Sequence, residues 1–201
     1  ELGEQVWEDG KLVELCSTPY DGIGCSVTNY TLYGEIPSNI GNLTNLNSLQ
    51  LSVNQFSGGI PEEIGNLSSL NYLRLNGNNL TGSIPTEIGN LINLTMLDLG
   101  NNEFEGSIPL EICNLTNLYY LLLYNNSLTG QIPYEIGNLT NVFLFVQSQN
   151  QLTGEIPPGI SNFTNVREFS LSYNQLIGEI PEEIGFMSNP NLYYISLDYN
   201  Q

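Results

Sequence analysis

The 201-residue sequence contains no histidine, and its basic residues are limited to Lys11, Arg74 and Arg167. The lack of histidine excludes a Ser-His-Asp triad and the imidazole ligands of common catalytic zinc sites. The three basic residues stand against 21 acidic ones, which leaves a formal net charge of −18. Nucleic acids and anionic membranes attract cationic surfaces, so this charge excludes both as partners. We interpret the acidity as a solubility feature, with cation binding or steering of a partner as the alternative.

Long apolar runs are also missing. No stretch approaches the roughly 18 consecutive apolar residues that a transmembrane helix requires, so we expect no membrane insertion in this segment. No signal peptide is visible, and the chain begins at Glu1 in polar sequence, as a mature or trimmed protein does.

Cysteine is sparse. Cys16 and Cys25 flank the short segment STPYDGIG, and this spacing predicts a disulfide that closes one end of the fold in an oxidising compartment. Cys113 stands alone. We expect Cys113 to be a half-buried, unreactive free thiol, because related positions elsewhere in the chain hold glycine.

The tetrapeptide Gly-x-Ile-Pro dominates what is present. Consecutive copies lie 24 residues apart, a period typical of leucine-rich repeats. The seven copies begin at Gly34, Gly58, Gly82, Gly106, Gly130, Gly154 and Gly178. Such regular spacing predicts a solenoid in which each repeat stacks on its neighbours.

Each position of the repeat has a physical interpretation. Leu73 and Leu75 alternate with polar or aromatic residues, which predicts a short strand with its leucines facing inward. An asparagine follows each strand, as at Asn78, and its amide is suited to bond backbone groups where the chain turns. Gly-x-Ile-Pro predicts a corner, and the EIGNL segment after it predicts a short 3₁₀ or helical stretch.

Two repeats depart from the pattern. Gln147 occupies an inward strand position where neighbouring repeats have Leu123 and Leu171, so its amide must find partners or distort the strand. The last repeat carries a two-residue insertion around Pro190, which predicts a bulged loop before Tyr193. This repeat is incomplete at Gln201, and a solenoid end needs a cap, so we expect the natural protein or assembly to continue.

The first 33 residues do not follow the repeat. Trp7 and the segment KLVELC predict a cap whose strand begins the sheet, with Trp7 shielding the open end of the core. We therefore divide the chain into a cap, residues 1–33, and seven repeats of the 24-residue type, residues 34–201.

The unit LxxLxLxxNxLxGxIPxxIGNL resembles the plant-specific subclass of leucine-rich repeats, found in receptor-kinase ectodomains, polygalacturonase-inhibiting proteins and secreted microbial homologues. The resemblance covers residues 34–201. It implies an α/β solenoid, a right-handed superhelix with a parallel β-sheet on its concave side and short 3₁₀ or helical segments on its convex side. It also implies a second small sheet beside Gly-x-Ile-Pro and an extracellular binding role for the concave side. Cys16 and the GIGC segment ending at Cys25 weakly resemble the paired-cysteine cap of these proteins.

The outward positions of the predicted strands carry an unusual set of apolar residues. Nothing in the repeat requires them, and a contiguous exposed apolar patch commonly marks an interaction surface. The alternative is that these side chains merely stabilise neighbouring strands. The set comprises Tyr72, Met96, Tyr119, Tyr120, Leu122, Tyr124, Phe143, Leu144 and Val146.

Asn-x-Ser/Thr motifs form a second group. They predict N-glycosylation in a eukaryotic secretory pathway, although Asn-Leu-Thr is also simply part of the repeat. The nine candidate asparagines are Asn29, Asn42, Asn66, Asn79, Asn93, Asn114, Asn125, Asn138 and Asn162.

The acids and glycines give little sign of chemistry. One repeat position holds Glu63, Glu87, Glu111, Glu135 and Glu183. We interpret these glutamates as a solvated face of the solenoid, with calcium bridging between them as the alternative. The glycines form corners rather than a phosphate loop. We expect no catalysis, no cofactor and no metal site.

Three functions fit these observations. The leading hypothesis is a secreted or cell-surface recognition module that binds a protein, peptide or glycan on its concave face. The second is a structural protein whose copies assemble into a filament or surface layer. A third, ice binding, rests on one exposed hydroxyl column interrupted by Ile92, namely Thr44, Ser68, Thr116, Thr140 and Thr164.

Overall fold

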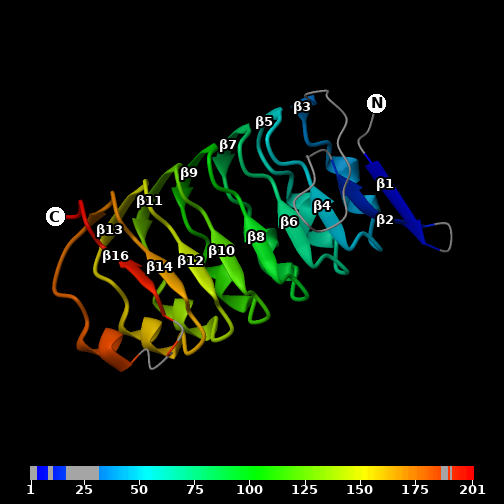
Figure 1. The fold of residues 1–201 in the computed structure, drawn as a ribbon. Helices are drawn as coiled ribbons and strands as arrows, with labels where there is room; N and C mark the ends of the chain where they lie inside the picture. The colour runs from blue at the N-terminus through cyan, green and yellow to red at the C-terminus, as the bar shows by residue number, and fades with distance from the viewer. Residues whose placement is uncertain (1–3, 9–10, 17–31, 187–189, 191) are drawn as a thin grey trace.

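The computed structural model describes residues 4–8, 11–16, 32–186, 190 and 192–201 (Figure 1). These residues form one elongated stack of coils, in which each repeat contributes a strand, a corner and a short 3₁₀ helix. The fold is the leucine-rich-repeat solenoid that the 24-residue period predicts.

The main sheet runs the length of the stack on the concave side (Figure 1). Strand β1 pairs antiparallel with β2, and every later neighbour is parallel. Its strands, in spatial order, are β1 (Glu4–Glu8), β2 (Lys11–Cys16), β4 (Ser48–Gln50), β6 (Tyr72–Arg74), β8 (Met96–Asp98), β10 (Tyr120–Leu122), β12 (Leu144–Val146), β14 (Glu168–Ser170) and β16 (Tyr194–Ser196). The same repeat position therefore falls side by side in successive coils.

The second sheet forms beside Gly-x-Ile-Pro, as the family resemblance implies. It is also parallel between neighbours. Its strands are β3 (Tyr33–Glu35), β5 (Gln55–Gly58), β7 (Asn79–Ser83), β9 (Glu103–Ser107), β11 (Ser127–Gln131), β13 (Gln151–Gly154) and β15 (Gln175–Leu176). The glycine of each corner has positive φ, for example +74° at Gly82, which a residue with a side chain adopts at a cost.

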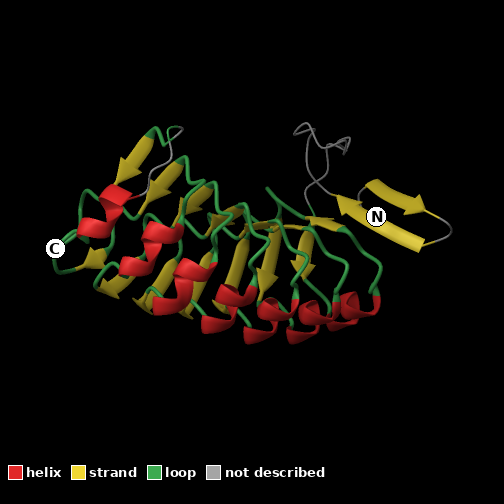
Figure 2. Ribbon diagram, turned by 90° about the horizontal axis from the view of Figure 1, so that it is seen from below, coloured by secondary structure: helices red, strands yellow, loops and turns green. Residues whose placement is uncertain are grey.

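Short 3₁₀ helices follow each proline corner and line up in a row (Figure 2). They confirm the prediction for the EIGNL segments. They are η1 (Ser38–Asn42), η2 (Glu62–Asn66), η3 (Thr86–Asn90), η4 (Leu110–Asn114), η5 (Tyr134–Asn138), η6 (Pro158–Asn162) and η7 (Glu182–Phe186). In the described part of the chain, no helix has the length or apolar content to cross a membrane.

The core is a continuous column of inward leucine, isoleucine and phenylalanine side chains. Leu73, Leu75 and Leu97 are fully buried, as the alternation of their strands predicts. Phe145 stacks on Phe169, with ring centroids 5.4 Å apart and planes at 11°. Because each coil covers the next, burial is shared along the whole stack.

A ladder of asparagines ties the coils together. The Asn102 amide donates to the carbonyls of Leu75 and Leu99, and its Oδ1 accepts the backbone N–H of Leu80. The same pattern recurs at Asn78 and Asn174. These bonds satisfy buried turn atoms from two successive coils, which confirms the structural interpretation of this position.

Two side chains interrupt the regular stack. Gln147 is fully buried; its Nε2 donates to the Leu121 carbonyl at 3.1 Å, while its Oε1 has no hydrogen-bond partner among the described residues. Cys113 is a free thiol that is 3% exposed, so the expectation of half-burial is wrong. Burial and the nearby Glu135 and Glu111 carboxylates raise the Cys113 pKa to about 12, which keeps the thiol protonated and unreactive.

The N-terminal part partly follows the prediction. The KLVELC segment is strand β2, and Leu15 lies opposite Leu49 of β4. However, β1 adds an antiparallel strand outside β2, so KLVELC is the second strand of the sheet. Cys25, the side chains of Trp7 and Cys16, and most of the insertion around Pro190 lie outside what the structure describes. The Cys16–Cys25 disulfide and the bulged loop therefore stay predictions.

Candidate concave binding face

The outward residues of the main sheet form aligned columns, because neighbouring strands are parallel and in register. In the first column, Met96 lies opposite Tyr72 and Tyr120, and Tyr120 lies opposite Leu144. In the second column, Leu122 lies opposite Val146. The structure thus brings together the apolar residues that the sequence analysis placed on the concave face. We call the nine residues of that set the concave patch.

The concave patch is less exposed than outward-facing positions suggest. Tyr119 is 41% exposed, while the other eight residues are half-buried. Their side chains cover one another, since strands in a sheet lie only about 4.8 Å apart. The patch is therefore a packed, shallow apolar surface rather than a row of separate exposed side chains.

Aromatic and cationic groups form one edge of the patch. The Tyr119 and Phe143 rings are 5.4 Å apart and tilted by 47°. In the next coil, the Arg167 guanidinium lies 5.2 Å from the centroid of the Phe143 ring, within cation–π range. This edge offers flat aromatic surface with a positive charge at one end.

A second charged group adjoins the patch on its N-terminal side. Arg74 of β6 lies opposite Asp98 of β8, which is only 4% exposed. Burial raises the pKa of Asp98 to about 6, against the lowering effects of the Gly100 N–H and of Arg74. Burial and the Asp98 charge together raise the pKa of Tyr124. The charge on this part of the face therefore changes in mildly acidic solution.

Short polar side chains border the patch at both ends of the sheet. At the N-terminal end, Gln50 donates to Ser48, and Ser52 donates to Asn76 of the next coil. At the C-terminal end, Ser196 donates to Asp198. The face thus has an apolar centre with polar side chains on either side, and the exposed Tyr193 and Tyr194 add aromatic surface at its C-terminal end.

The candidate glycosylation sites occupy several different positions of the repeat, and Asn125 directly follows the patch residue Tyr124. The eight candidate asparagines within residues 32–201 are exposed, whereas Asn29 lies outside the described residues. Asn42, Asn66, Asn114, Asn138 and Asn162 each end a 3₁₀ helix and form one ridge. Attached sugars on this ridge would leave the concave patch uncovered.

The glutamates that share one repeat position lie at the surface. Glu111 and Glu135 sit in successive 3₁₀ helices, where each faces solvent at least in part. Within the described residues, no group of three or more His, Cys, Asp or Glu side chains is placed to hold a metal ion.

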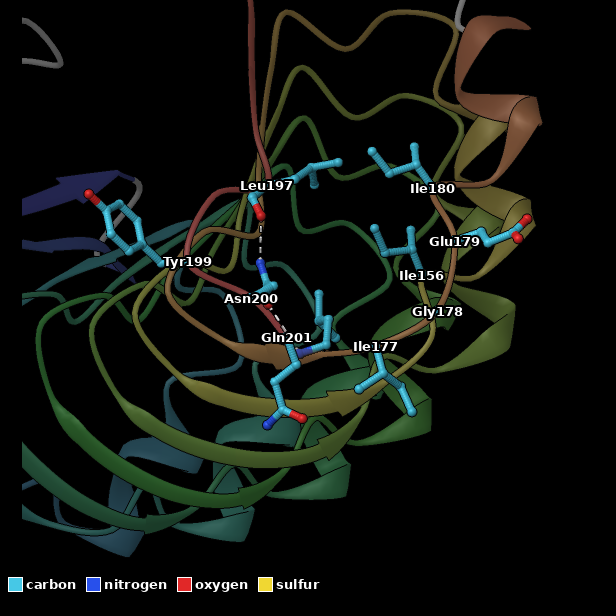
Figure 3. Close-up of a pocket in the computed structure, with 10 residues that line it drawn as sticks. Ile156, Ile177, Gly178, Glu179, Ile180, Leu197, Tyr199, Asn200 and Gln201 are labelled. Atoms are coloured by element: carbon cyan, nitrogen blue, oxygen red, sulfur yellow. Dashed lines mark hydrogen bonds between the residues drawn. The ribbon is translucent and has the colours of Figure 1, made fainter.

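A pocket of about 290 Å³ opens at the C-terminal end of the stack (Figure 3). Ile156, Ile177 and Ile180 line one side, and Leu197 and Asn200 face them, with the Asn200 amide bonded to the Leu197 carbonyl (Figure 3). Ile180 is 61% exposed, whereas its equivalent Ile156 is 8% exposed beneath the following coil.

Sequence reasoning missed a second surface, which lies between the second sheet and the row of 3₁₀ helices. Three adjoining hollows there hold about 520, 330 and 370 Å³, and we call them together the corner groove. Two of its lining residues, Leu110 and Tyr134, begin η4 and η5, where other repeats place Ser38, Glu62 or Thr86. The apolar residues at these two usually polar positions could have indicated the groove from the sequence.

Comparison with known families gives a direct match. A model described as a leucine-rich repeat region matches residues 59–183, and a single leucine-rich repeat model matches residues 45–67. The first match covers more than half of the chain. A search of curated proteins finds no significant match.

Solved structures include several similar proteins. The ectodomain of the Arabidopsis thaliana receptor kinase GASSHO1/SCHENGEN3, in complex with CASPARIAN STRIP INTEGRITY FACTOR 2, is 37% identical with a TM-score of 0.83; the alignment covers 88% of this chain and 21% of that one. The Arabidopsis HAESA ectodomain, in complex with an extended IDA peptide hormone, is 38% identical with a TM-score of 0.82, covering 88% and 29%. A plant ice-binding protein is 30% identical with a TM-score of 0.79, covering 100% and 69%.

This chain spans only a fifth to a third of those two receptor ectodomains. The repeat register, the parallel pairing of the repeat strands in both sheets and the asparagine ladder agree with the family match over residues 59–183. The chain therefore belongs to the leucine-rich-repeat family, in the form found in plant extracellular receptors.

Proposed function

We propose that the chain is an extracellular, non-catalytic recognition module that binds a peptide or protein segment on its concave patch. The observation that carries this proposal is the alignment of Tyr72, Met96, Tyr120 and Leu144 across four neighbouring strands. A solenoid of this kind needs only inward leucines for its stability, so the outward apolar column requires another explanation.

Peptide or protein is the ligand class that fits the face best. Its centre is apolar and aromatic, whereas Arg74 and Arg167 stand at its margins. An extended chain lying across the strands would bury apolar side chains centrally and place polar or charged groups toward the ends. Similar receptor ectodomains have been solved with peptide ligands, which supports the same class here.

The proposal is tested by selecting random peptides displayed on phage against the immobilised protein. The Tyr120→Asp, Leu122→Asp double variant serves as the counter-selection target. We expect an enriched family of peptides that contain apolar or aromatic residues and bind the unaltered protein. Failure to enrich any peptide, or enrichment on both targets alike, would contradict a concave peptide site.

Self-assembly is the second candidate, because a second copy of the chain could cover the aligned apolar residues of the concave patch. It predicts that the apparent mass rises with concentration in light scattering after size-exclusion chromatography. A stable monomer at millimolar concentration would rule it out. Peptide binding on the concave patch does not require the apparent mass to rise with concentration, so the two outcomes are distinguishable.

Ice binding is a third candidate, favoured by a similarity to a plant ice-binding protein that covers all of this chain and 69% of that one. The hydroxyl column that includes Thr116 and Thr140 is exposed, but the equally exposed Ile92 interrupts it. Thermal hysteresis and ice-crystal shaping by the purified protein test this function directly. Neither effect is expected from a peptide-binding module.

A further inference from the structure

The corner groove is continuous along several coils. Its first two hollows share Gln131 as a wall, and its second and third share Glu155, Ile156 and Pro158. It runs from Ser83 in the third coil to Glu183 in the seventh. It lies outside the concave patch, since none of the nine patch residues lines it.

Apolar side chains line the groove and reach solvent. Tyr134 is 69% exposed, Leu110 52% and Ile177 50%. Pro158 adds a further apolar surface at the first position of η6. Because the same position is polar in η1, η2, η3 and η7, the apolar residues gather only in the coils that form the groove.

Cys113 distinguishes the coil at the start of the groove from its neighbours. At Gly89, an added Cβ would lie 2.6 Å from the Glu111 carbonyl oxygen, too close for any real contact. Cys113 occupies the same position one coil later and carries a buried side chain. The Cys113 side chain therefore fills space toward η5 that glycine leaves empty at Gly89, and the hollow of about 520 Å³ lined by Glu111 and Glu135 adjoins this step.

The charge of the groove has one sign. Glu111, Glu135, Glu155, Glu179 and Glu183 line it or its end. The three basic residues of the chain lie elsewhere: Lys11 in β2, Arg74 in β6 and Arg167 beside β14. A partner with positive charges therefore meets no cation in the groove to repel it.

We propose that the corner groove is a docking site for a cationic, amphipathic polypeptide segment, separate from the concave site. Leucine-like side chains of the segment pack against Leu110, Tyr134 and Ile177. Its lysine or arginine side chains face the glutamates on the rim. The proposal does not rest on the concave function, because the two surfaces share no residue.

A fluorophore-labelled octapeptide of alternating lysine and leucine is the probe, measured by fluorescence anisotropy in about 0.15 M salt, where weak long-range attraction is screened. We expect saturable binding by the full chain. An octapeptide of alternating lysine and serine has the same charge without the apolar side chains, and we expect its binding to be about tenfold weaker or worse. Equal binding of the two peptides, or no binding of either at millimolar concentration, would overturn the proposal.

Matched variants locate the site. Leu110→Ser with Tyr134→Ser keeps the charge, and Glu111→Gln with Glu135→Gln keeps the apolar lining; each pair should weaken the lysine–leucine peptide about tenfold. Glu62→Gln with Glu63→Gln removes the same charge from η2, outside the groove, and should change binding less than twofold. All these side chains reach solvent, so the variants should fold normally.

The control variants also exclude the other surfaces. If the Glu62 and Glu63 pair weakens binding as much as the Glu111 and Glu135 pair, the peptide senses net charge and the proposal is wrong. If Tyr120→Asp with Leu122→Asp abolishes binding while Leu110→Ser with Tyr134→Ser leaves it intact, the peptide occupies the concave patch. That result would support binding at the concave patch and overturn the proposal that the peptide binds the corner groove.

Discussion

The ring of Tyr124 occupies the space above Gly100 of the preceding coil. A Cβ added to Gly100 would lie 2.3 Å from Cε1 of Tyr124, and the nearby Asp98 is almost fully buried. The tyrosine ring therefore fits at position 124 because residue 100 has no side chain. This pair fixes how one residue of the concave patch packs against the preceding coil.

Gly100→Ala should force the Tyr124 ring to move and destabilise the fold by about 1–2 kcal/mol through overpacking. Gly100 has no positive φ, so its backbone accepts alanine once the ring is removed. In a Tyr124→Ser background the same substitution should be neutral or slightly stabilising. Urea unfolding of the four proteins measures the coupling. Equal effects of Gly100→Ala in both backgrounds would show that the ring does not limit this site.

Asp98 should make stability depend on pH. Its pKa rises from 3.8 to about 6 on folding, so the folded protein binds this proton more tightly than the unfolded chain does. Stability from this group is present below about pH 4 and is lost as pH rises through about 6, by up to about 3 kcal/mol. Asp98→Asn should remove that loss and keep the bond from the Gly100 N–H.

The measurement is the difference in unfolding free energy between Asp98→Asn and the unaltered protein. It should grow by about 2–3 kcal/mol between about pH 4 and pH 7.5. Taking the difference cancels repulsion among the other acids, which both proteins share. A difference that stays constant across this range would mean that Asp98 titrates normally.

Gln147→Leu should stabilise the protein by about 1–3 kcal/mol. The substitution removes a fully buried Oε1 that has no partner among the described residues, and it restores the leucine found at the neighbouring Leu123 and Leu171. The converse change Leu123→Gln should destabilise by at least as much. A loss of stability in Gln147→Leu, measured by urea unfolding, would show that the amide is needed in the core.

Val53→Asn should raise stability by about 1 kcal/mol. Val53 is a β-branched residue at φ +54°, and the equivalent positions hold Gly77 and Asn101, which adopt this conformation more easily. Its side chain is 68% exposed, so little packing is lost. Val53→Thr keeps the β-branch and should give no gain. Similar midpoints for both variants in thermal unfolding would contradict this interpretation.

The periodic part of the molecule could be predicted from the sequence because each repeated residue meets its own copy in the next coil. The inward leucines, the Asn102 position and the Gly-x-Ile-Pro corner follow from one repeat alone. The features that differ between coils could not. The fit of Tyr124 over Gly100 and the burial of the Cys113 side chain depend on side-chain sizes in adjacent coils. A pattern that treats the coils as equal does not contain that information.

The concave patch shows the same division. Its residues were identifiable because outward strand positions alternate with the inward leucines. Its half-buried state was not predictable, since burial depends on how Tyr72, Met96 and Tyr120 cover one another across strands. The corner groove was missed because its apolar residues lie at the start of 3₁₀ helices, where no alternation marks them.

The central claim is that ligand binds the concave patch, and isothermal titration of a phage-selected peptide tests it most directly. Tyr120→Asp with Leu122→Asp is compared with Thr116→Asp and Thr140→Asp, which add the same charge at exposed positions outside the concave patch. Tyr120→Ser with Leu122→Ser provides an uncharged version should the first pair unfold. We predict that the concave variants weaken the Kd at least about tenfold and that the Thr116 and Thr140 pair changes it less than twofold. Equal weakening by both pairs, or full affinity in the folded concave variants, would contradict the account.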